Sequence, residues 1–288
     1  MSETRLSMGA VPSAPAIFFS DMDGTFLDDQ KRIGPLSWKM LDAVAAAGAL
    51  FVPCTGRALT GIPHELVEHP AVRYVVASNG AAVYDATSGE ALMRTPLSRE
   101  RLMELLALTR GRDVVFDIFA RGTCFCWRPN YDRLDAFTRD EAETRFMQSL
   151  RTPYDESPAE FIETIEDADR VTFLWRDPAD RDALARGLAA DPSLSVVRSL
   201  PFNFEVSDAQ ATKGTALTWL CGHLGIPLER SYAFGDSIND LSMLGRAGTG
   251  VAMANAEAET KAAADVTYAS NNDEGVARFI LEELARLG

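Results

Sequence analysis

The chain has 288 residues and a formal net charge of −14 at neutral pH, with 47% hydrophobic and 24% charged residues. These fractions are those of an ordinary globular protein, long enough for one large domain or two modest ones. The negative charge argues against non-specific nucleic-acid binding, and it requires any anionic substrate to be attracted by local groups. No apolar run reaches the ~18 residues of a membrane span, so we expect no membrane partner.

Residues 1–15 lack the basic start and apolar stretch of a signal peptide, so we expect a disordered leader and a cytoplasmic location.

The four cysteines are scattered at Cys54, Cys124, Cys126 and Cys221. The middle pair is too close for a relaxed disulfide within one strand, and no nearby histidine completes a zinc set. We interpret all four as structural or incidental.

Residues 16–95 alternate short buried strands with helices. The expected elements are a strand at Ala16–Ser20, a helix at Leu36–Ala47, strands at Leu50–Cys54 and Tyr74–Ala77, and a hairpin formed by 83–84 and 91–93. Buried strands separated by helices are typical of a parallel sheet that is covered on both faces.

The pattern of expected strands and helices changes at residues 96–200, and the earlier alternation returns after them. The middle segment is expected to hold strands at Val114–Ile118, Thr123–Arg128, Val171–Trp175 and Ser195–Arg198, with helices at Arg99–Thr109 and Asp180–Ala190. Residues 201–288 again alternate helices, beginning at Lys213–Leu224, with short strands. The sequence therefore predicts an α/β fold, in which residues 16–95 and 201–288 form a doubly wound parallel-sheet core and residues 96–200 form an inserted α+β domain.

An acidic motif, Asp21-Met22-Asp23-Gly24-Thr25, follows the first strand. Residues i and i+2 of a strand point the same way, so Asp21 and Asp23 should start on one side. Two carboxylates about 4 Å apart repel by about 4 kcal/mol at an effective dielectric of ~20. A divalent cation or a shared proton usually relieves such repulsion. A solvated acidic turn is the alternative interpretation.

Three more polar clusters fall where the expected elements begin or end. They are Thr55-Gly56-Arg57, Lys213-Gly214 and Gly235-Asp236-Ser237-Ile238-Asn239-Asp240. Ligands of open parallel sheets bind at the carboxyl ends of the strands, and a helix N-terminus attracts anions. Thr55 or Asp236 alone could be a helix cap. Capping does not explain four clusters at one edge.

Together these motifs resemble the haloacid dehalogenase (HAD) superfamily, and in detail its Cof-type phosphatases with a type IIB cap. Ser78-Asn79-Gly80-Ala81, Val251-Ala252-Met253 with Asn255-Ala256, and the segment 272–277 also match. The resemblance covers both core segments almost completely, whereas in the middle block it covers only length and topology. It implies a HAD-like, Rossmannoid core whose insertion at 96–200 is a cap domain that closes over the strand ends.

The resemblance implies a role for each motif residue. Asp21 would be the nucleophile that forms an aspartyl-phosphate, and Asp23 would protonate the leaving group and then activate water. Thr55 would bind a phosphoryl oxygen beside the Gly56 N–H group. Lys213 would neutralise the nucleophile and the transferring group.

The implied cofactor is Mg²⁺, held by the Asp21 carboxylate, the Asp23 backbone carbonyl and Asp236. Asn239 and Asp240 would orient this shell and the phosphate. An ordinary cap of the helix that follows is the alternative for Asp240, and both roles can coexist. For Arg57 a cap contact, a substrate contact and a salt bridge within the core remain open. Asn79 is expected to shape its loop rather than bind a ligand.

The function implied is that of a Mg²⁺-dependent phosphatase. Its substrate would be a small soluble phosphomonoester, either a sugar phosphate or a phosphorylated cofactor. We expect the protein to be a monomer or a small homo-oligomer. A phosphomutase is the first alternative, because relatives with a similar cap share the first motif. A non-catalytic module that binds phosphorylated metabolites is the second.

Overall fold

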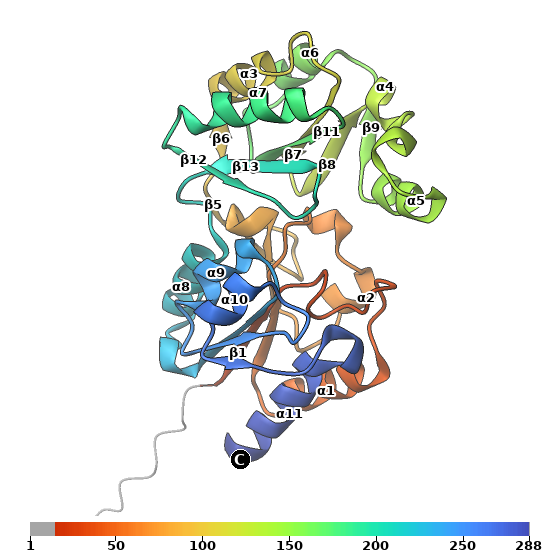
Figure 1. The fold of residues 1–288 in the computed structure, drawn as a ribbon. Helices are drawn as coiled ribbons and strands as arrows, with labels where there is room; N and C mark the ends of the chain where they lie inside the picture. The colour runs from red at the N-terminus through yellow and green to blue at the C-terminus, as the bar shows by residue number, and fades with distance from the viewer. Residues whose placement is uncertain (1–14, 288) are drawn as a thin grey trace, which may run out of the picture.

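The structure is a computed structural model that describes residues 15–287, so all but the last residue of the expected leader lies outside the described part. The described chain forms two stacked domains (Figure 1). The lower domain contains β1, α1 and α11, and the upper domain contains β7, β11, α3 and α7. The upper domain is the inserted segment, and both of its connections run into the same side of the lower domain.

The core sheet has five parallel strands in the order β16-β15-β14-β1-β2. These strands are β1 (Ile17–Ser20), β2 (Leu50–Pro53), β14 (Ser231–Gly235), β15 (Thr249–Ala252) and β16 (Val266–Thr267). Beside β2 lie the antiparallel strands β3 (Tyr74–Ala77), β4 (Ala82–Asp85) and β5 (Ala91–Arg94). A single parallel bridge between Cys54 and Val76 joins the two sheets.

Helices cover both faces of the core sheet. They are α1 (Pro35–Ala46), α2 (His64–Val67), α8 (Lys213–Leu224), α9 (Leu241–Leu244), α10 (Ala258–Ala263) and α11 (Gly275–Leu287). Successive residues of β1 point to opposite faces, so Phe18 packs with α1 and α11 while Phe19 packs with α8. The predicted doubly wound core is confirmed.

The inserted domain contains a six-stranded sheet in the order β12-β13-β11-β7-β8-β9. Its strands are β7 (Val114–Ala120), β8 (Thr123–Trp127), β9 (Thr152–Tyr154), β11 (Arg170–Trp175), β12 (Leu194–Val197) and β13 (Asn203–Asp208). Only the β8–β9 pair is parallel. A separate antiparallel pair joins β6 (Leu97–Ser98) to β10 (Asp167–Ala168).

Five helices accompany this sheet: α3 (Arg99–Ala107), α4 (Arg128–Tyr131), α5 (Glu141–Ser149), α6 (Pro158–Glu163) and α7 (Pro178–Ala189). Figure 1 shows α3 and α7 on the side of the sheet that faces away from the core domain. The opposite face of the sheet is therefore turned toward the carboxyl ends of the core strands.

The second domain boundary differs from the sequence prediction. Strand β13, Asn203–Asp208, pairs with both β11 and β12, so it belongs to the inserted sheet. The expected return to the core at residue 201 is therefore too early, and the chain re-enters the core after Asp208. Its alternation of polar Asn203, Glu205 and Ser207 with apolar Phe204 and Val206 is the signature of a half-buried strand.

Cys54, Cys124, Cys126 and Cys221 are all free and buried, in agreement with the structural role expected for them. Among residues 15–287, every helix is too short or too polar to cross a membrane.

Two glycines of α8 provide a paired test of the packing that holds this helix. A Cβ atom on Gly214 would lie 2.1 Å from the Ser242 carbonyl oxygen, whereas one on Gly222 would meet no atom within 4 Å. We expect Gly214→Ala to lower the free energy of unfolding by about 1–3 kcal/mol. Gly222→Ala should raise it by about 0.5–1 kcal/mol, because alanine is the better helix former. Urea unfolding of the two variants checks this, and two changes of the same sign would contradict it.

Candidate active site

The four predicted motifs meet at one edge of the core sheet. Asp21 directly follows β1, Thr55 lies just beyond β2, Asp236 directly follows β14, and Lys213 is the first residue of α8. Parallel strands present their carboxyl ends at the same edge, which is why segments so distant in sequence converge. Between this edge and the inserted domain lies a cavity of about 760 Å³. The predicted site residues that line it are Asp21, Asp23, Thr55, Gly56, Arg57, Asp236 and Asn239.

Lys213 lies fully buried behind the cavity wall. Its Nζ atom is 2.6 Å from Oδ1 of Asp21 and 2.6 Å from Oδ1 of Asp240. Burial lowers the pKa of Lys213, but the two carboxylates outweigh burial and raise that pKa above its ordinary value. The lysine is therefore a fixed cation that orients the Asp21 carboxylate.

Asp240 positions Lys213 and completes the capping box of the turn that contains it, but its side chain makes no capping hydrogen bond to α9, the helix that follows it. Its Oδ1 atom binds Lys213, while its Oδ2 atom accepts hydrogen bonds from the backbone N–H groups of Asp236 and Ser237 at 2.9 and 3.1 Å. It thus caps the short 3₁₀ turn Ile238–Asp240 and positions the lysine at the same time. The carboxylate connects the loop after β14 to the start of α8.

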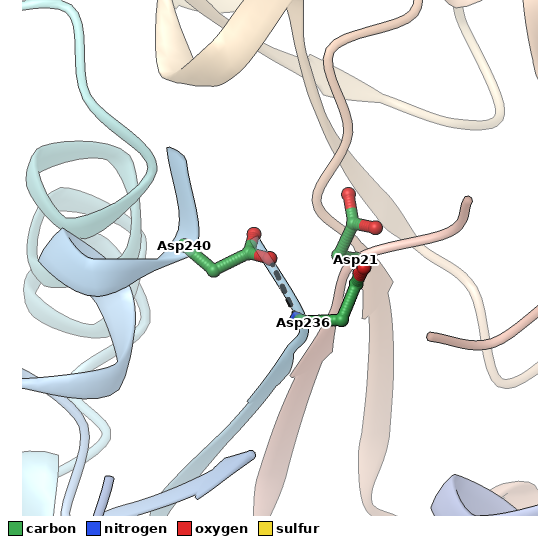
Figure 2. A group of neighbouring side chains, drawn as sticks. All are labelled: Asp21, Asp236 and Asp240. Carbon is green, nitrogen blue, oxygen red and sulfur yellow. Dashed lines mark hydrogen bonds between the residues drawn. The ribbon is translucent and has the colours of Figure 1, made fainter. Parts of the chain in front are cut away.

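Asp21, Asp236 and Asp240 offer carboxylate oxygens that all lie within 4.8 Å of one another (Figure 2). Burial, followed by the charge of Asp240, raises the pKa of Asp236 to about 6. Burial also raises the pKa of Asp21, although Lys213 opposes this effect. The raised pKa values mean that burial and mutual repulsion disfavour the ionised carboxylates. A hard divalent cation would relieve this repulsion, and its preferred ligands are oxygen atoms.

Gly24 gives this cluster its room. The residue has a φ of +89°, and a Cβ atom there would lie 2.7 Å from Oδ2 of Asp236. The neighbouring Thr25 hydroxyl donates a 2.7 Å hydrogen bond to Oδ1 of Asp236. The Gly-Thr pair of the first motif therefore holds the aspartate of the last motif.

Asp23 is held apart from this cluster by two cations. Arg57 binds it in a bidentate manner, with Nε–Oδ2 at 2.8 Å and Nη2–Oδ1 at 2.7 Å, and Lys31 Nζ lies 2.8 Å from Oδ1. Burial raises the pKa of Asp23, but the Arg57 and Lys31 contacts outweigh it and lower that pKa to about 2. The expected repulsion between the two aspartates is therefore relieved by separate basic partners, Lys213 for Asp21 and this pair for Asp23.

Arg57 combines two of the three contacts considered for it. Besides its salt bridge to Asp23, its guanidinium lies 5.2 Å from the ring centre of Phe146, which belongs to α5 of the inserted domain.

The backbone N–H of Arg57 donates to the Thr55 hydroxyl oxygen at 3.1 Å. This bond leaves the hydroxyl hydrogen of Thr55 available to donate into the cavity.

Asn79 connects the two domains, which exceeds the loop-shaping role expected for it. The residue does adopt a left-handed conformation, with φ 59° and ψ 27°. Its amide also donates to Glu205 of β13 at 2.5 Å and accepts from Asn239 at 3.1 Å. Glu205 is in turn 2.6 Å from Nη1 of Arg170.

Several residues of the site were not found from the sequence. Lys31, Phe146, Arg170 and Glu205 line the same cavity, yet none belongs to a motif. The alternating pattern of β13 was the one local signal that could have placed Glu205. The others reach the cavity through tertiary packing alone.

A parallel α/β core, an inserted cap and a carboxylate cluster at the strand ends define a Rossmann-like hydrolase. Residues 18–280 match the model of the haloacid dehalogenase-like hydrolase family, and the chain belongs to this family. It is 32% identical over 91% of its length to the Bacillus subtilis protein named "Putative phosphatase YxeH". The match covers 96% of that protein. The enzymatic class of the chain is accordingly that of the phosphatases.

Two further matches describe the range of the family. A 5-amino-6-(5-phospho-D-ribitylamino)uracil phosphatase of Bacillus subtilis, YcsE, is 28% identical over 90% of this chain and 92% of its own length. The structure of the HAD subclass IIB sugar phosphatase BT4131 superposes with a TM-score of 0.79 at 24% identity, covering 93% of this chain and 98% of that one. The second match concerns the fold alone, and it confirms the expected type of cap.

Glu205 gives a pH-dependent test of the link between the domains. Burial raises its pKa, but Arg170, Ser199 and Asn79 outweigh burial and lower that pKa below the ordinary value. A carboxylate with a lowered folded-state pKa stabilises the protein above its unfolded pKa of about 4.3, and this contribution is lost as the pH falls through the folded value. At neutral pH, Glu205→Gln should destabilise the protein by about 3 kcal/mol, because Arg170 loses its buried partner.

Thermal unfolding of the wild type and Glu205→Gln between neutral pH and about pH 3.5 checks this expectation. The difference in Tm should shrink on the acid side. The exposed Glu166 of the same domain offers a control, and Glu166→Gln should follow the wild type throughout. A Tm difference that stays constant with pH would contradict the role of Glu205.

Proposed function

We propose that this chain is a Mg²⁺-dependent phosphatase that hydrolyses a small soluble phosphomonoester, a sugar phosphate or a phosphorylated cofactor, through an aspartyl-phosphate on Asp21. The observation that carries the proposal is the Asp21 carboxylate, which lines the cavity and is bound by a buried lysine 2.6 Å away. YcsE is named for the hydrolysis of a phosphorylated ribityl compound, which supports the substrate class.

The first chemical step is an in-line attack of an Asp21 oxygen on phosphorus, which breaks the bond to the leaving oxygen. Lys213 holds Asp21 in one orientation and balances its charge. The Thr55 hydroxyl and the Gly56 N–H group donate to the phosphoryl oxygens. Asp23 protonates the leaving oxygen. It can carry this proton only after Arg57 and Lys31 release its carboxylate, because their charges otherwise lower its pKa to about 2 and keep it ionised.

The second step returns the enzyme to its starting state. A water molecule attacks the phosphorus of the aspartyl-phosphate and gives a proton to Asp23, and the Asp21 carboxylate leaves as inorganic phosphate forms. The Mg²⁺ ion would be held by Asp21, Asp236 and the Asp23 backbone carbonyl, and when bound it supplies charge neutralisation at the phosphoryl oxygens. Asp240 and Asn239 keep these groups in place.

Hydrolysis of 4-nitrophenyl phosphate tests the proposal directly. We expect turnover with Mg²⁺, loss of turnover with a chelator, and recovery when Mg²⁺ is returned.

Asp21→Asn should lower kcat by at least about 10³-fold, because an amide cannot act as the nucleophile. The exposed Asp135 provides the matched control, and Asp135→Asn should keep full activity. Robust turnover by Asp21→Asn would contradict the mechanism, and sugar-phosphate isomers without free phosphate would indicate a mutase.

Asp23 is tested through the leaving group. Asp23→Asn should lower kcat/KM for an alkyl phosphate by about 10²–10⁴-fold, the usual contribution of a general acid. The loss with 4-nitrophenyl phosphate should be smaller, because nitrophenolate leaves without a proton. Equal losses for the two substrates, with the Tm unchanged, would rule out proton donation by Asp23.

A further inference from the structure

The loop that follows the nucleophile is held by residues from the far end of the chain. This loop, residues 24–29, leads from the first motif toward α1. It contacts two other loops of the core domain, residues 253–257 after β15 and residues 269–274 before α11. Each of these two loops overlaps a segment that matches the haloacid dehalogenase pattern but contains none of the residues that act on phosphate.

Asn255 joins the three loops at one point. Its side-chain Nδ2 atom donates to the Gly24 carbonyl oxygen at 2.7 Å, and its Oδ1 atom accepts from the Asn271 backbone N–H at 3.1 Å. A carbonyl oxygen can only accept and a backbone N–H can only donate, so the amide fits in one orientation alone. The Gly24 carbonyl is therefore held by a donor whose own position is fixed by a second loop.

Asn271 extends this connection along the loop that follows the nucleophile. The residue is 2% exposed, and its Nδ2 atom donates to the Leu27 carbonyl oxygen at 3.0 Å and to Oδ1 of Asp29 at 3.1 Å. Together the two asparagines bind the loop at its start, its middle and its end. A loop with so many bonded groups has little freedom to open locally. The peptide that follows Gly24 therefore keeps one orientation.

That peptide leads directly to the carboxylate cluster. The Thr25 hydroxyl donates to Oδ1 of Asp236 at 2.7 Å. The backbone N–H of Glu257, in the same loop as Asn255, donates to the backbone carbonyl oxygen of Asp236 at 3.0 Å. The loop after β15 thus holds Asp236 directly, and through Gly24 it also holds the threonine that orients the Asp236 carboxylate.

A hard divalent cation is sensitive to the direction of its oxygen ligands. Mg²⁺ demands nearly octahedral geometry, and the loss of groups that orient its ligands without touching the ion weakens binding by about 10–100-fold. Asp236 is one of the three aspartates whose carboxylate oxygens lie within 4.8 Å of one another. A residue that orients Asp236 should therefore affect metal affinity rather than the binding of phosphate.

We propose that Asn255, anchored by Asn271, is a positioning residue that sets the Mg²⁺ affinity of the site by fixing Gly24 and Thr25 against Asp236. Neither asparagine lines the cavity that contains the nucleophile, so neither contacts the substrate. The inference rests on the Mg²⁺ dependence in the proposed function, and it adds two residues that lie outside the four motifs.

Binding of Mg²⁺ alone to the full chain tests the proposal without a substrate, through titration calorimetry and the rise in Tm with Mg²⁺. Asn255 is exposed, so its truncation leaves no buried void. Asn255→Ala should raise the Kd for Mg²⁺ by about fivefold, the equivalent of one net hydrogen bond. At saturating Mg²⁺, kcat and KM for 4-nitrophenyl phosphate should return to the wild-type values, because Asn255 touches neither the substrate nor the nucleophile.

Asn272→Ala is the matched control. Asn272 exchanges two hydrogen bonds with Asp29, its Nδ2 atom donating to Oδ2 at 3.0 Å and its Oδ1 atom accepting from the backbone N–H at 3.1 Å. Its truncation loosens the far end of the same loop and leaves the bond to Gly24 in place. The Mg²⁺ affinity of this variant should therefore equal that of the wild type.

A double-mutant cycle tests the route through Thr25. Thr25→Val removes the hydroxyl that binds Asp236 and should raise the Kd for Mg²⁺ by about tenfold or more. Because Asn255 acts through Thr25, the double variant should bind Mg²⁺ little more weakly than Thr25→Val alone. Two fold-changes that multiply would show separate routes and would contradict the inference.

The outcomes separate this inference from the proposed function. A wild-type chain that shows no response to Mg²⁺ in Tm or calorimetry, and that hydrolyses the ester equally well with a chelator, would overturn both. A wild type that requires Mg²⁺, with an Asn255→Ala variant of unchanged Mg²⁺ affinity, would overturn the inference alone. Equal losses of affinity in Asn255→Ala and Asn272→Ala would do the same, because they would indicate a general loosening of the loop.

Discussion

A buried lysine between two carboxylates is the interaction on which the site depends. Opposite charges about 4 Å apart attract by about 4 kcal/mol at an effective dielectric of ~20, and desolvation makes each of them costly when it is alone. Lys213 therefore ties Asp21, at the end of β1, to Asp240, in the loop after β14. The end of β1, the start of α8 and the loop after β14 are distant in sequence, but their charged side chains contact one another. These contacts fix the positions of the three segments at the carboxyl edge of the sheet.

The core and its motifs were largely predictable from the sequence, because local rules determine both. Apolar runs separated by helices define a parallel sheet, and that sheet brings Asp21, Thr55 and Asp236 to one edge whatever the cap looks like. The partners of Asp23 were less accessible. Arg57 was a candidate among three possibilities, and Lys31, in a turn with φ 63°, carried no signal of its own.

The cap was predictable as an α+β insertion but not in its chemistry. Which residues of an antiparallel sheet stand opposite one another depends on register, and register is set by packing between strands far apart in sequence. Thr172 meets Glu205 only because β13 pairs with β11, and the boundary expected at residue 201 excluded β13 from the cap. Thr172 and Glu205 both line the cavity that contains Asp21.

The Asn79 loop has a consequence for how the two domains could have diversified. Glu205 of the cap binds Asn79, and the adjacent Gly80 approaches Thr212 so closely that a Cβ atom would lie 2.2 Å from its carbonyl oxygen. Thr212 immediately precedes Lys213. A cap exchanged for that of another protein leaves this amide unpaired unless it brings an acceptor, at a cost of about 1–3 kcal/mol beside the backbone that supports the lysine. Recombination between such enzymes is constrained to transfer the insertion and its receiving loop together.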